Sequence, residues 1–482
     1  MLVQRTDVIL RPDPTRVLIR YFSPGSRDRI ERIIGRVMCL DKRKLPQRLE
    51  MVCRRFESRH KDIEAAFLRH YEVVVPYLLT DAIPSLDQQL LIGAYFTSEY
   101  SLECAALFNP SIVPHPDQSS TDEGVLRFIM SLRATGEGHV SSIVFREGTI
   151  NTAGSISMES PGGVVTDPEV VQNPTYDKPV FAAKLYEMGY DNDITADVLK
   201  NLAEVFTLAD LKQQIAQAET AIMRFGADRV DTLQVMRILA EQNYEIKFAG
   251  ARPISDRVIF PRMSHNRKAL EDARFVKFQN PDGTAIYYAT YTAYDGRTFL
   301  PQLLQTEDFL NFRFITLNGS GVMNKGMALF PRKINGQYAM LSRQDGENIF
   351  IMFSDHLHFW ENPSVIMKPT ASWEYVQLGN CGSPIETPEG WLVLTHGVGP
   401  MRRYCIGAVL LDLEDPTKVI GRLNEPLLEP DKNERDGYVP NVVYTCGALV
   451  HGRKLVMPYA MADYATRIAL VDLDELLKKL KE

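Results

Sequence analysis

A weak repeat with a spacing of about 50 residues constrains the fold of this chain more than any other sequence feature. Thr306-Glu-Asp-Phe-Leu-Asn-Phe312 resembles Ser354-Asp-His-Leu-His-Phe-Trp360, and looser echoes occur at 411–416 and 471–475. Aromatic and β-branched residues are dense in this half of the chain, as in 286–294, which is typical of strands. The spacing fits a four-stranded blade of a β-propeller, whose blades run about 40–50 residues, although a β-sandwich also contains many short strands.

Length and composition limit the classes of protein to consider. A chain of 482 residues is too long for one simple core, so two or three structural units are expected. Hydrophobic residues make up 45%, charged residues make up 24%, and the formal net charge is −7. Nucleic-acid binding needs clustered Lys and Arg, and no long basic run occurs, so no nucleic-acid partner is expected.

Cysteine usage and the lack of long apolar runs predict the compartment. The six cysteines are scattered without a CxxC pair, which argues against a disulfide framework and a structural zinc site. The first residues contain no apolar segment typical of a secretion signal. No apolar run approaches the ~20 residues that span a bilayer. We therefore expect no membrane association and a reducing cytoplasm.

Changes in periodicity divide the chain into four segments. The predicted segments are an N-terminal helical domain at 1–105, the first part of the β-propeller at 106–177, a helical insertion at 178–245 and the remainder of the propeller at 246–482. One amphipathic stripe in the first segment consists of Ile30, Ile33, Ile34 and Val37. The expected class is therefore mainly β with two helical additions.

Helix starts are signalled in both helical segments. Ser85 with Gln88 has the spacing of a capping box, and Thr207 with Asp210 has a similar spacing. We expect the insertion to pack on the N-terminal helices. A homo-oligomer is expected to form through these helical additions.

Four segments in the β-rich part combine residue types that scaffold alone does not require. They are Leu270-Glu-Asp-Ala-Arg-Phe-Val276, Met323–Lys333 with Leu341-Ser-Arg343, Gly382–Trp391 with Thr395-His-Gly397, and Gly437-Tyr-Val-Pro-Asn441 with Met461-Ala-Asp463. Together, and in this order, they resemble the glycoside hydrolase family known as family 130, which contains the β-mannoside phosphorylases. The resemblance covers about 104–166 and 248–476 and leaves out both helical segments.

The resemblance implies a fold and an activity. The family fold is a five-bladed β-propeller, in agreement with the repeat. The implied activity is inverting phosphorolysis of β-mannosides, by a hexosyl-transferring phosphorylase that gives α-mannose 1-phosphate and a shortened acceptor. The implied partners are a β-mannoside oligosaccharide and inorganic phosphate as co-substrate, with no metal and no other cofactor.

The resemblance also assigns roles near the sugar. Asp272 aligns with the general acid, which donates its proton through a hydroxyl of the bound mannose. Arg274 is expected to support it and to contact the substrate. Ala273 replaces the proline that follows the acid in the family. Asn109, Arg146 and Asp463 match residues that hold the sugar at the cleavage subsite.

A second set of residues aligns with the phosphate site of the family. Its members are Lys325, Arg343, Gln377, His396 and Tyr404. Arginine binds phosphate in a bidentate way, whereas lysine offers a point charge. Lys325 replaces an arginine and keeps its charge. Gln377 replaces a charged residue but still donates hydrogen bonds. The predicted phosphate binding is therefore weaker than in the family but retained.

The chemistry explains why these residue types are needed. A conventional inverting glycosidase uses an acid and a base that activates water, whereas phosphate is itself a nucleophile. A phosphorylase therefore needs one acid and cationic donors that align the phosphate. The acid should have a raised pKa. Glu271 is expected on the opposite face, because strand neighbours alternate.

Simpler interpretations stand beside these. Asp272 with Arg274 could form a strand-end turn and ion pair, and His396 could be a core histidine. Arg332 and Lys333 are more typical of an exposed hairpin, given the Ile-Asn-Gly turn after them. His265, Asn266 and Arg267 are expected on the loop that leads to the acid. Two rival functions stay open at this point.

The first rival is a β-1,2-mannosidase of the same fold, with Glu386 as a candidate base. The second is a carbohydrate-binding protein without activity.

Overall fold

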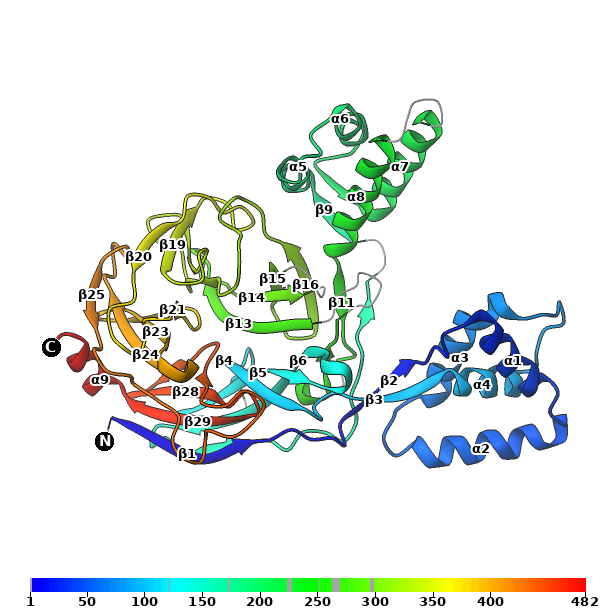
Figure 1. The fold of residues 1–482 in the computed structure, drawn as a ribbon, viewed down its shortest axis with the longest axis horizontal. Helices are drawn as coiled ribbons and strands as arrows, with labels where there is room; N and C mark the ends of the chain where they lie inside the picture. Colours follow the sequence, from blue (N-terminus) through cyan, green and yellow to red (C-terminus); the bar gives the residue numbers. More distant parts are fainter. Residues whose placement is uncertain are drawn as a thin grey trace.

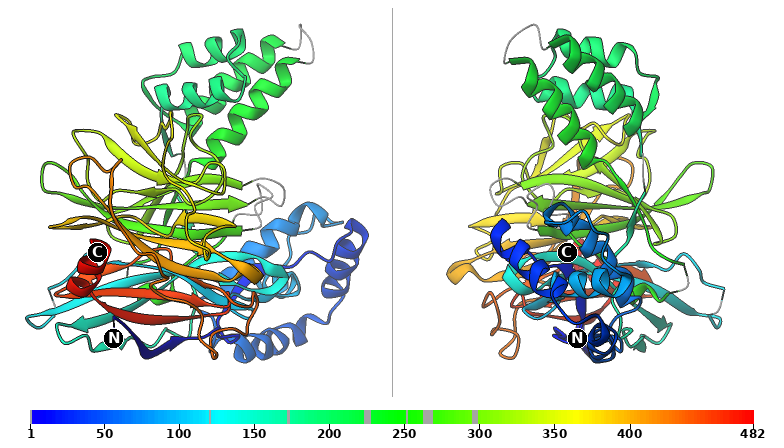
Figure 2. Two further views of the ribbon diagram at one scale, coloured as in Figure 1. Left: turned by 60° about the vertical axis from the view of Figure 1, so that its left-hand side comes forward. Right: turned by 90° about the vertical axis from the view of Figure 1, so that its right-hand side faces the viewer.

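The computed structural model describes residues 2–119, 121–171, 174–222, 228–250, 252–261, 269–294 and 299–482. Figure 1 shows β-sheets arranged around a common centre with two helical bodies outside them, and Figure 2 shows the same arrangement from two further sides. The loop with His265, Asn266 and Arg267 lies outside the described residues.

Five antiparallel strand groups, here called sheets 1 to 5, form the main body. Sheet 1 contains β4 (Ala106–Pro114), β5 (Val125–Thr135), β6 (Ser141–Asn151), β7 (Ile156–Met158) and β12 (Val258–Ile259). Sheet 2 contains β13 (Ala269–Gln279), β14 (Ala285–Tyr294), β15 (Phe299–Thr306) and β16 (Asn311–Thr316), extended by β11 (Glu245–Lys247) and β8 (Glu169–Val170). A single parallel pairing of Ala269 with Ser141 joins the two.

The other three sheets follow in chain order. Sheet 3 contains β17 (Ala328–Leu329), β18 (Tyr338–Ser342), β19 (Ile349–Ser354) and β20 (Ser364–Met367). Sheet 4 contains β21 (Gln377–Asn380), β22 (Ile385–Thr387), β23 (Gly390–Val398), β24 (Tyr404–Leu411) and β25 (Val419–Arg422). Sheet 5 contains β26 (Val443–Tyr444), β27 (Leu449–His451), β28 (Lys454–Met461) and β29 (Ala465–Asp472), after which helix α9 (Leu473–Leu480) packs on its core.

Apolar clusters between neighbouring sheets hold the ring together. Pairs that share a cluster across successive junctions are Phe145 with Phe275, Phe278 with Leu329, Leu341 with Trp391, Leu394 with Met457, and Val456 with Phe128. Because the last pair joins sheet 5 to sheet 1, the sheets form a closed ring. Burial of these faces is the main stabilising contribution.

The N-terminal strand corrects the predicted first boundary. β1 (Val3–Leu10) pairs antiparallel with β29, and Val3 lies opposite Val471. Arg5 reinforces this pairing through the buried carboxylate of Glu434, which also accepts hydrogen bonds from Tyr459 (2.5 Å) and Arg467 (3.4 Å). Residues 3–10 therefore belong to sheet 5 and not to the helical domain.

The N-terminal helical domain lies on a two-stranded ribbon. The ribbon consists of β2 (Val17–Tyr21) and β3 (Thr97–Ser101), and the helices are α1 (Arg27–Met38), α2 (Leu45–Phe56), α3 (Ile63–Val74) and α4 (Leu86–Tyr95). Ile30, Ile34 and Val37 are buried, as the apolar stripe predicts. The capping box is confirmed, because the Ser85 hydroxyl accepts from the Gln88 amide and the Gln88 side chain accepts from the Ser85 amide.

The helical insertion has its own apolar core. It contains β9 (Thr175–Asp177), α5 (Lys178–Glu187), α6 (Asp193–Lys200), β10 (Val205–Thr207), α7 (Leu208–Ile222) and α8 (Asp228–Gln242). Asp210 accepts from the Thr207 amide at 2.8 Å, so the predicted helix start is confirmed. The expected packing on the N-terminal helices is wrong, since Figures 1 and 2 place the two helical bodies apart.

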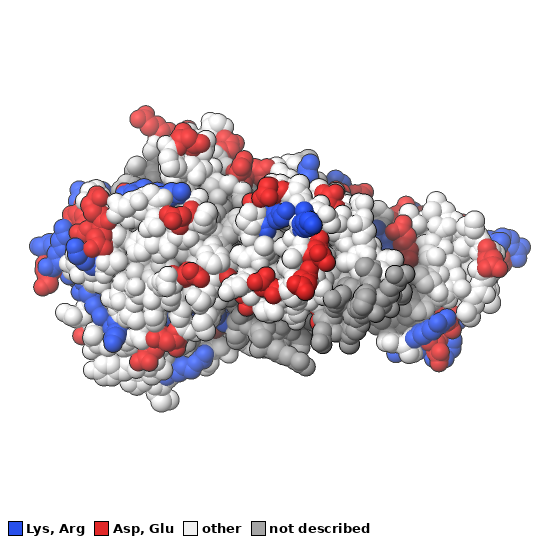
Figure 3. Space-filling view, turned by 90° about the horizontal axis from the view of Figure 1, so that it is seen from above, with Lys and Arg blue, Asp and Glu red and all other residues white. Residues whose placement is uncertain are grey.

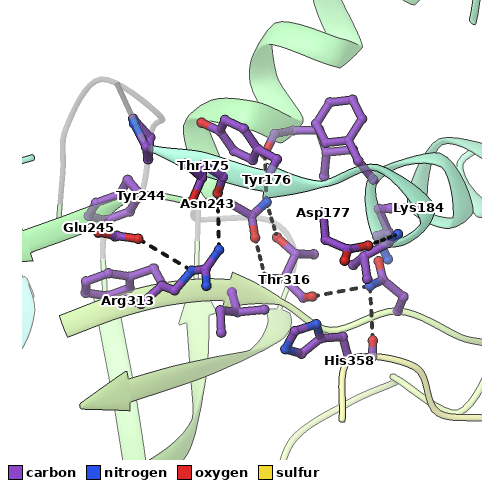
Figure 4. Close-up of a pocket in the computed structure, with 17 residues that line it drawn as sticks. Thr175, Tyr176, Asp177, Lys184, Asn243, Tyr244, Glu245, Arg313, Thr316 and His358 are labelled. Atoms are coloured by element: carbon purple, nitrogen blue, oxygen red, sulfur yellow. Dashed lines mark hydrogen bonds and ion pairs between the residues drawn. The ribbon is translucent and has the colours of Figure 1, made fainter. Parts of the chain in front are cut away.

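The insertion instead docks on sheet 2. Figure 4 shows Arg313 of β16 donating to the Thr175 carbonyl (3.2 Å) and Asn243 accepting from the Thr316 amide (2.8 Å). A cavity of about 50 Å³ lies in this seam. Burial and the charge of Arg313 lower the pKa of His358, which lines the cavity, to about 4, so its ring is neutral there.

Charge is mixed over the surface. On the face in Figure 3, Lys and Arg side chains alternate with Asp and Glu side chains. Within the described ranges, no helix is both long and apolar enough to cross a membrane.

Candidate active site

Three residues at one end of the ring have a left-handed backbone. Asn109, Asp272 and Asp463 have φ of 49°, 54° and 49°. Asn109 lies at a register shift in β4, Asp272 lies at a register shift in β13, and Asp463 forms the turn after β28. Such conformations cost about 1–3 kcal/mol in non-glycine residues and cluster at functional sites. The bulges turn polar side chains of otherwise apolar strands toward one another.

Asp272 is held by an amide and a guanidinium. The Asn109 side-chain amide donates to Asp272 Oδ1 at 2.7 Å, and Arg133 Nη1 lies 3.5 Å from the same oxygen. Burial acts to raise the pKa of the Asp272 carboxyl, but Arg133, Arg274 and Lys325 together with the Asn109 hydrogen bond hold it below its usual value. The expectation of a raised pKa is wrong for Asp272, because Arg133 and Lys325, which are distant in sequence, join Arg274 of the same strand around its carboxyl.

Glu271 joins the same cluster. Its carboxylate lies between Arg133 Nη2 and Lys325 Nζ, each at 2.7 Å. The expected alternation of faces does not separate it from Asp272, because the bulge between Glu271 and Arg274 interrupts the strand pleat. Arg133 therefore contacts both carboxylates.

Asp463 has the environment that was expected of Asp272. Burial, and next the negative charge of Asp272, raise the pKa of the Asp463 carboxyl to about 6. Arg133 and Arg402 oppose this shift only in part. The two neighbouring carboxyls therefore differ, with Asp272 ionised and Asp463 able to retain a proton in weakly acidic solution.

Arg274 is a structural support for the acid segment. Its side chain is buried and donates to the Cys381 carbonyl (2.6 Å), the Asp272 carbonyl (3.0 Å) and the Tyr444 hydroxyl (2.9 Å). The predicted contact with substrate is therefore not supported. Arg274 fixes the backbone of Asp272, which agrees with the expected supporting role.

A second cluster gathers four of the predicted phosphate residues. Arg343 Nη1 lies 2.8 Å from His396 Nε2, the Gln377 amide lies 3.3 Å from the same nitrogen, and the Tyr404 ring stacks on His396. Burial and the charges of Arg343 and Arg274 hold the pKa of His396 well below its usual value. The ring is therefore neutral, and Nε2 accepts from Arg343.

This cluster contains an unused donor. The Nε of Arg343 is buried, and among the described residues it has no hydrogen-bond partner. The backbone at Gly379 lies so close to His396 that an added Cβ would sit 2.4 Å from its ring. A buried guanidinium with a free N–H fits an anion with several oxygens.

The two clusters form one site. Arg274 links the Asp272 carbonyl to the Tyr444 hydroxyl, and the Tyr444 ring lies 5.1 Å from His396 in an edge arrangement. Lys325 is the exception among the predicted phosphate residues, because its ammonium contacts Glu271 on the acid side.

Arg146 is bound by a buried carboxylate of the protein. Its guanidinium is 3% exposed and donates to both oxygens of Glu103 (2.8 Å each) and to the Phe145 carbonyl (2.9 Å). Arg16 binds the same Glu103, so these residues form a buried ion cluster at the base of the ribbon. These hydrogen bonds hold the Arg146 guanidinium within the protein, and its contact with the sugar stays a prediction.

Sequence reasoning missed Arg133 and Tyr444. Arg133 is the cation closest to the acid, and the Tyr444 hydroxyl positions Arg274. Neither lies in a motif with a recognised role, so only the strand pairing reveals them. Glu386, a candidate base, forms a surface pair with Arg332 at 2.7 Å.

Metal chemistry has no obvious site here. Over the parts of the chain that the structure describes, no group of three His, Cys, Asp or Glu side chains is arranged to hold a metal ion.

Comparison with known proteins gives the family. The model of the glycoside hydrolase 130 family, described as β-1,4-mannooligosaccharide phosphorylase, matches residues 222–482. A 1,2-β-oligomannan phosphorylase from Thermoanaerobacter is 38% identical over 218 residues, 43% of this chain and 70% of the relative. A β-1,2-mannobiose phosphorylase from the same organism is 37% identical over 43% of this chain and 68% of its own.

A further relative and a solved structure complete the comparison. A β-1,4-mannooligosaccharide phosphorylase from Ruminococcus albus is 33% identical over 44% of this chain and 63% of its own. The solved β-1,2-mannobiose phosphorylase of Listeria innocua is 22% identical with a TM-score of 0.45, over 79% of this chain and 93% of that one. Since the family model matches more than half of the sequence, this chain belongs to glycoside hydrolase family 130.

Proposed function

We propose that this protein is an inverting β-mannoside phosphorylase with inorganic phosphate as its co-substrate. An oxygen of phosphate attacks the anomeric carbon of the terminal mannose, the bond to the acceptor oxygen breaks, and that oxygen takes up a proton. The products are α-mannose 1-phosphate and a shortened acceptor. The relatives named as mannoside phosphorylases support this reaction class.

The observation that carries the proposal is the unused Nε donor of Arg343 across from Asp272. Arg343 has a free N–H, while Gln377 and Tyr404 surround a neutral His396. A phosphate dianion placed there gains charge-assisted hydrogen bonds and needs no base. Glu386, which a hydrolase could use as its base, is paired with Arg332 at the surface.

Asp272 is the proposed source of the proton, passed through a mannose hydroxyl. Three cations hold the pKa of the Asp272 carboxyl below its usual value. A phosphate dianion near Lys325 and Arg343 offsets those charges and raises the pKa of Asp272. Proton uptake therefore accompanies phosphate binding. Asn109, which donates to Asp272, and Asp463 are the residues proposed to hold the mannose beside this carboxyl.

We also propose that the ring of five sheets is a five-bladed β-propeller. The closed series of apolar junctions and the pairing of β1 with β29 support it. A reducing cytoplasm is the proposed compartment, since all six cysteines are free. Self-association through the helical domain is proposed from its exposed Leu79 and Ile83, and light scattering tests it.

The test is turnover of β-1,2- and β-1,4-mannobiose with and without phosphate. We expect α-mannose 1-phosphate to form only with phosphate, and Arg343→Ala to raise the KM for phosphate at least about tenfold, a loss of about 1.4 kcal/mol. Arg332→Ala, at the surface, is the matched control. Equal rates without phosphate, with free mannose as the product, would instead establish a mannosidase.

A further inference from the structure

Two exposed side chains from different sheets meet at the rim of the site. The Tyr438 hydroxyl lies 3.4 Å from His139 Nδ1, and their rings are 5.7 Å apart with a tilt of 37°. Tyr438 precedes β26 of sheet 5, and His139 lies in the connection between β5 and β6 of sheet 1. The Tyr438 ring is 57% exposed, so its position is set by its loop and not by burial.

The loop that contains Tyr438 is hydrogen-bonded to the turn that contains Asp463. The Val439 amide donates to the Ala462 carbonyl at 2.9 Å. At Gly437 an added Cβ would lie 2.6 Å from the same carbonyl and 2.9 Å from the Tyr464 Cβ, so only glycine allows this approach. Tyr438 is therefore held beside the carboxyl that faces Asp272.

A hydrogen bond from strand β3 holds the loop that contains His139. His139 has a φ of 58°, and the Tyr100 hydroxyl of β3 donates to the Glu137 carbonyl at 2.8 Å. The strand that leads into this loop carries Arg133, which contacts both Glu271 and Asp272. His139 therefore lies above the acid side of the site.

The position of the pair across the ring identifies what it can bind. Arg343 comes from sheet 3, which lies opposite the junction of sheets 5 and 1 in a ring of five. In an inverting displacement the nucleophile and the leaving group occupy opposite faces of the anomeric carbon. With phosphate at Arg343, the departing sugar must lie toward Tyr438 and His139.

We propose that Tyr438 and His139 form the platform that binds the acceptor sugar and set which acceptor is used; this rests on the proposed function. The Tyr438 ring offers an apolar face for the C–H groups of a pyranose, and the His139 imidazole offers hydrogen bonds to its hydroxyls. Both groups touch the acceptor and neither touches the phosphate.

The test is the reverse reaction, with α-mannose 1-phosphate and a panel of mannose, glucose, N-acetylglucosamine and manno-oligosaccharides. Tyr438→Ala should raise the KM for the best acceptor about tenfold, while the KM for α-mannose 1-phosphate stays within about twofold. Tyr438→Phe should restore most of the affinity, because it keeps the ring, and His139→Ala should change the ranking of acceptors. Tyr186→Ala, at an equally exposed tyrosine (69%) on α5, is the control.

Equal changes in both KM values, or an unchanged acceptor KM, would overturn the platform. Calorimetric titration with β-1,2- and β-1,4-mannobiose gives the same comparison without turnover. Weaker binding by both Tyr438→Ala and His139→Ala supports the platform even if the wild-type protein uses no phosphate. Failure of the proposed function and failure of the platform are thereby distinguished.

Discussion

At the scale of single residues, the site depends on two carboxyls that neighbour each other and titrate differently. Asp272 is surrounded by cations and an amide, whereas Asp463 is buried next to the negative charge of Asp272. Both occupy left-handed backbone, which asparagine also tolerates. Substitution by asparagine therefore removes the titrating group with little change in shape.

Asp272→Asn should lower kcat/KM for β-mannobiose phosphorolysis by about 10²–10⁴-fold, the usual contribution of a general acid. Affinity for phosphate should be retained or rise, because the phosphate donors belong to sheets 3 and 4 and the variant removes a negative charge that repels the dianion. The measurement is initial rates against phosphate and sugar. Asp282→Asn, in the exposed hairpin at the other end of β13, should retain wild-type rates. Full activity in Asp272→Asn would place the acid elsewhere.

Asp463 should make the protein less stable as pH rises. Its pKa is about 6 in the fold against an ordinary value of 3.8, so the folded state binds more protons between these values. The stability from this group is complete below pH 3.8 and is lost as pH rises through about 6. Asp463→Asn should therefore raise the free energy of unfolding by about 1–3 kcal/mol at pH 7.5 and by only about 0.5 kcal/mol at pH 4.

Denaturant unfolding at the two pH values measures this gain. Asp436→Asn, at an exposed aspartate of the neighbouring loop, is the control and should not reproduce the gain of Asp463→Asn. A gain of the same size at both pH values would mean that the effect does not come from titration of Asp463.

The sequence predicted which residues lie near Asp272 better than it predicted their contacts. Motif order placed Asn109, Asp272, Asp463 and the Arg343 cluster in one site, and the structure brings them together. Arg146 was assigned to the sugar by resemblance, and the structure shows it bound to Glu103. Arg133 was missed, and the direction of the Asp272 pKa was wrong, because Arg133 and Lys325 come from segments distant in sequence and no local pattern predicts that they approach Asp272.

At the scale of elements, local signals and long-range pairings were predicted unequally. Both capping-box spacings correspond to real helix starts, and the Ile-Asn-Gly turn before β18 is a tight hairpin with φ of 49° at Asn335 and 86° at Gly336. These features involve neighbours along the chain. The pairing of β1 with β29 joins opposite ends of the sequence, so periodicity gives no indication of it.

Glu434 is the residue that should matter most for this pairing. Its carboxylate is buried and binds Arg5 of β1, Tyr459 of β28 and Arg467 of β29. Glu434→Gln removes the countercharge of Arg467 and leaves Arg5 with Asp431 alone at 3.5 Å, so we expect a loss of about 3 kcal/mol in unfolding free energy, the lower end for a broken buried ion pair. Chemical denaturation measures it. Glu361→Gln, at an exposed site, is the control, and equal stability of the two variants would show that Glu434 does not hold β1.

At the scale of the whole molecule, the ring of five sheets and the N-terminal helical domain are separate structural units. The ribbon ends where Tyr21 lies opposite Thr97, and the helices beyond it have their own core. Replacing 22–96 by an Asn-Gly turn should therefore close the ribbon as a hairpin and leave the ring folded. We expect kcat/KM within about threefold of the full chain, since stacking of the sheets does not involve these helices.

Steady-state kinetics and circular dichroism check this outcome. A loss of more than about a hundredfold would show instead that the helical domain, from the same or another copy, completes the site. Deletion of the insertion would also disturb sheet 2, because hydrogen bonds of Arg313 and Asn243 join the insertion to that sheet.

The pairing of β1 with β29 also affects when the fold can be completed during synthesis. During synthesis β1 leaves the ribosome with no partner, because Val471 of β29 is made long after Val3, which it pairs with. Until then sheet 5 has an open edge, and Asp463 cannot be held against Asp272. The exposed edge of β1 is a site for mispairing or for chaperones during that interval. Activity should therefore begin only when synthesis has passed residue 472, so that translation itself sets the earliest moment at which the protein can act on substrate.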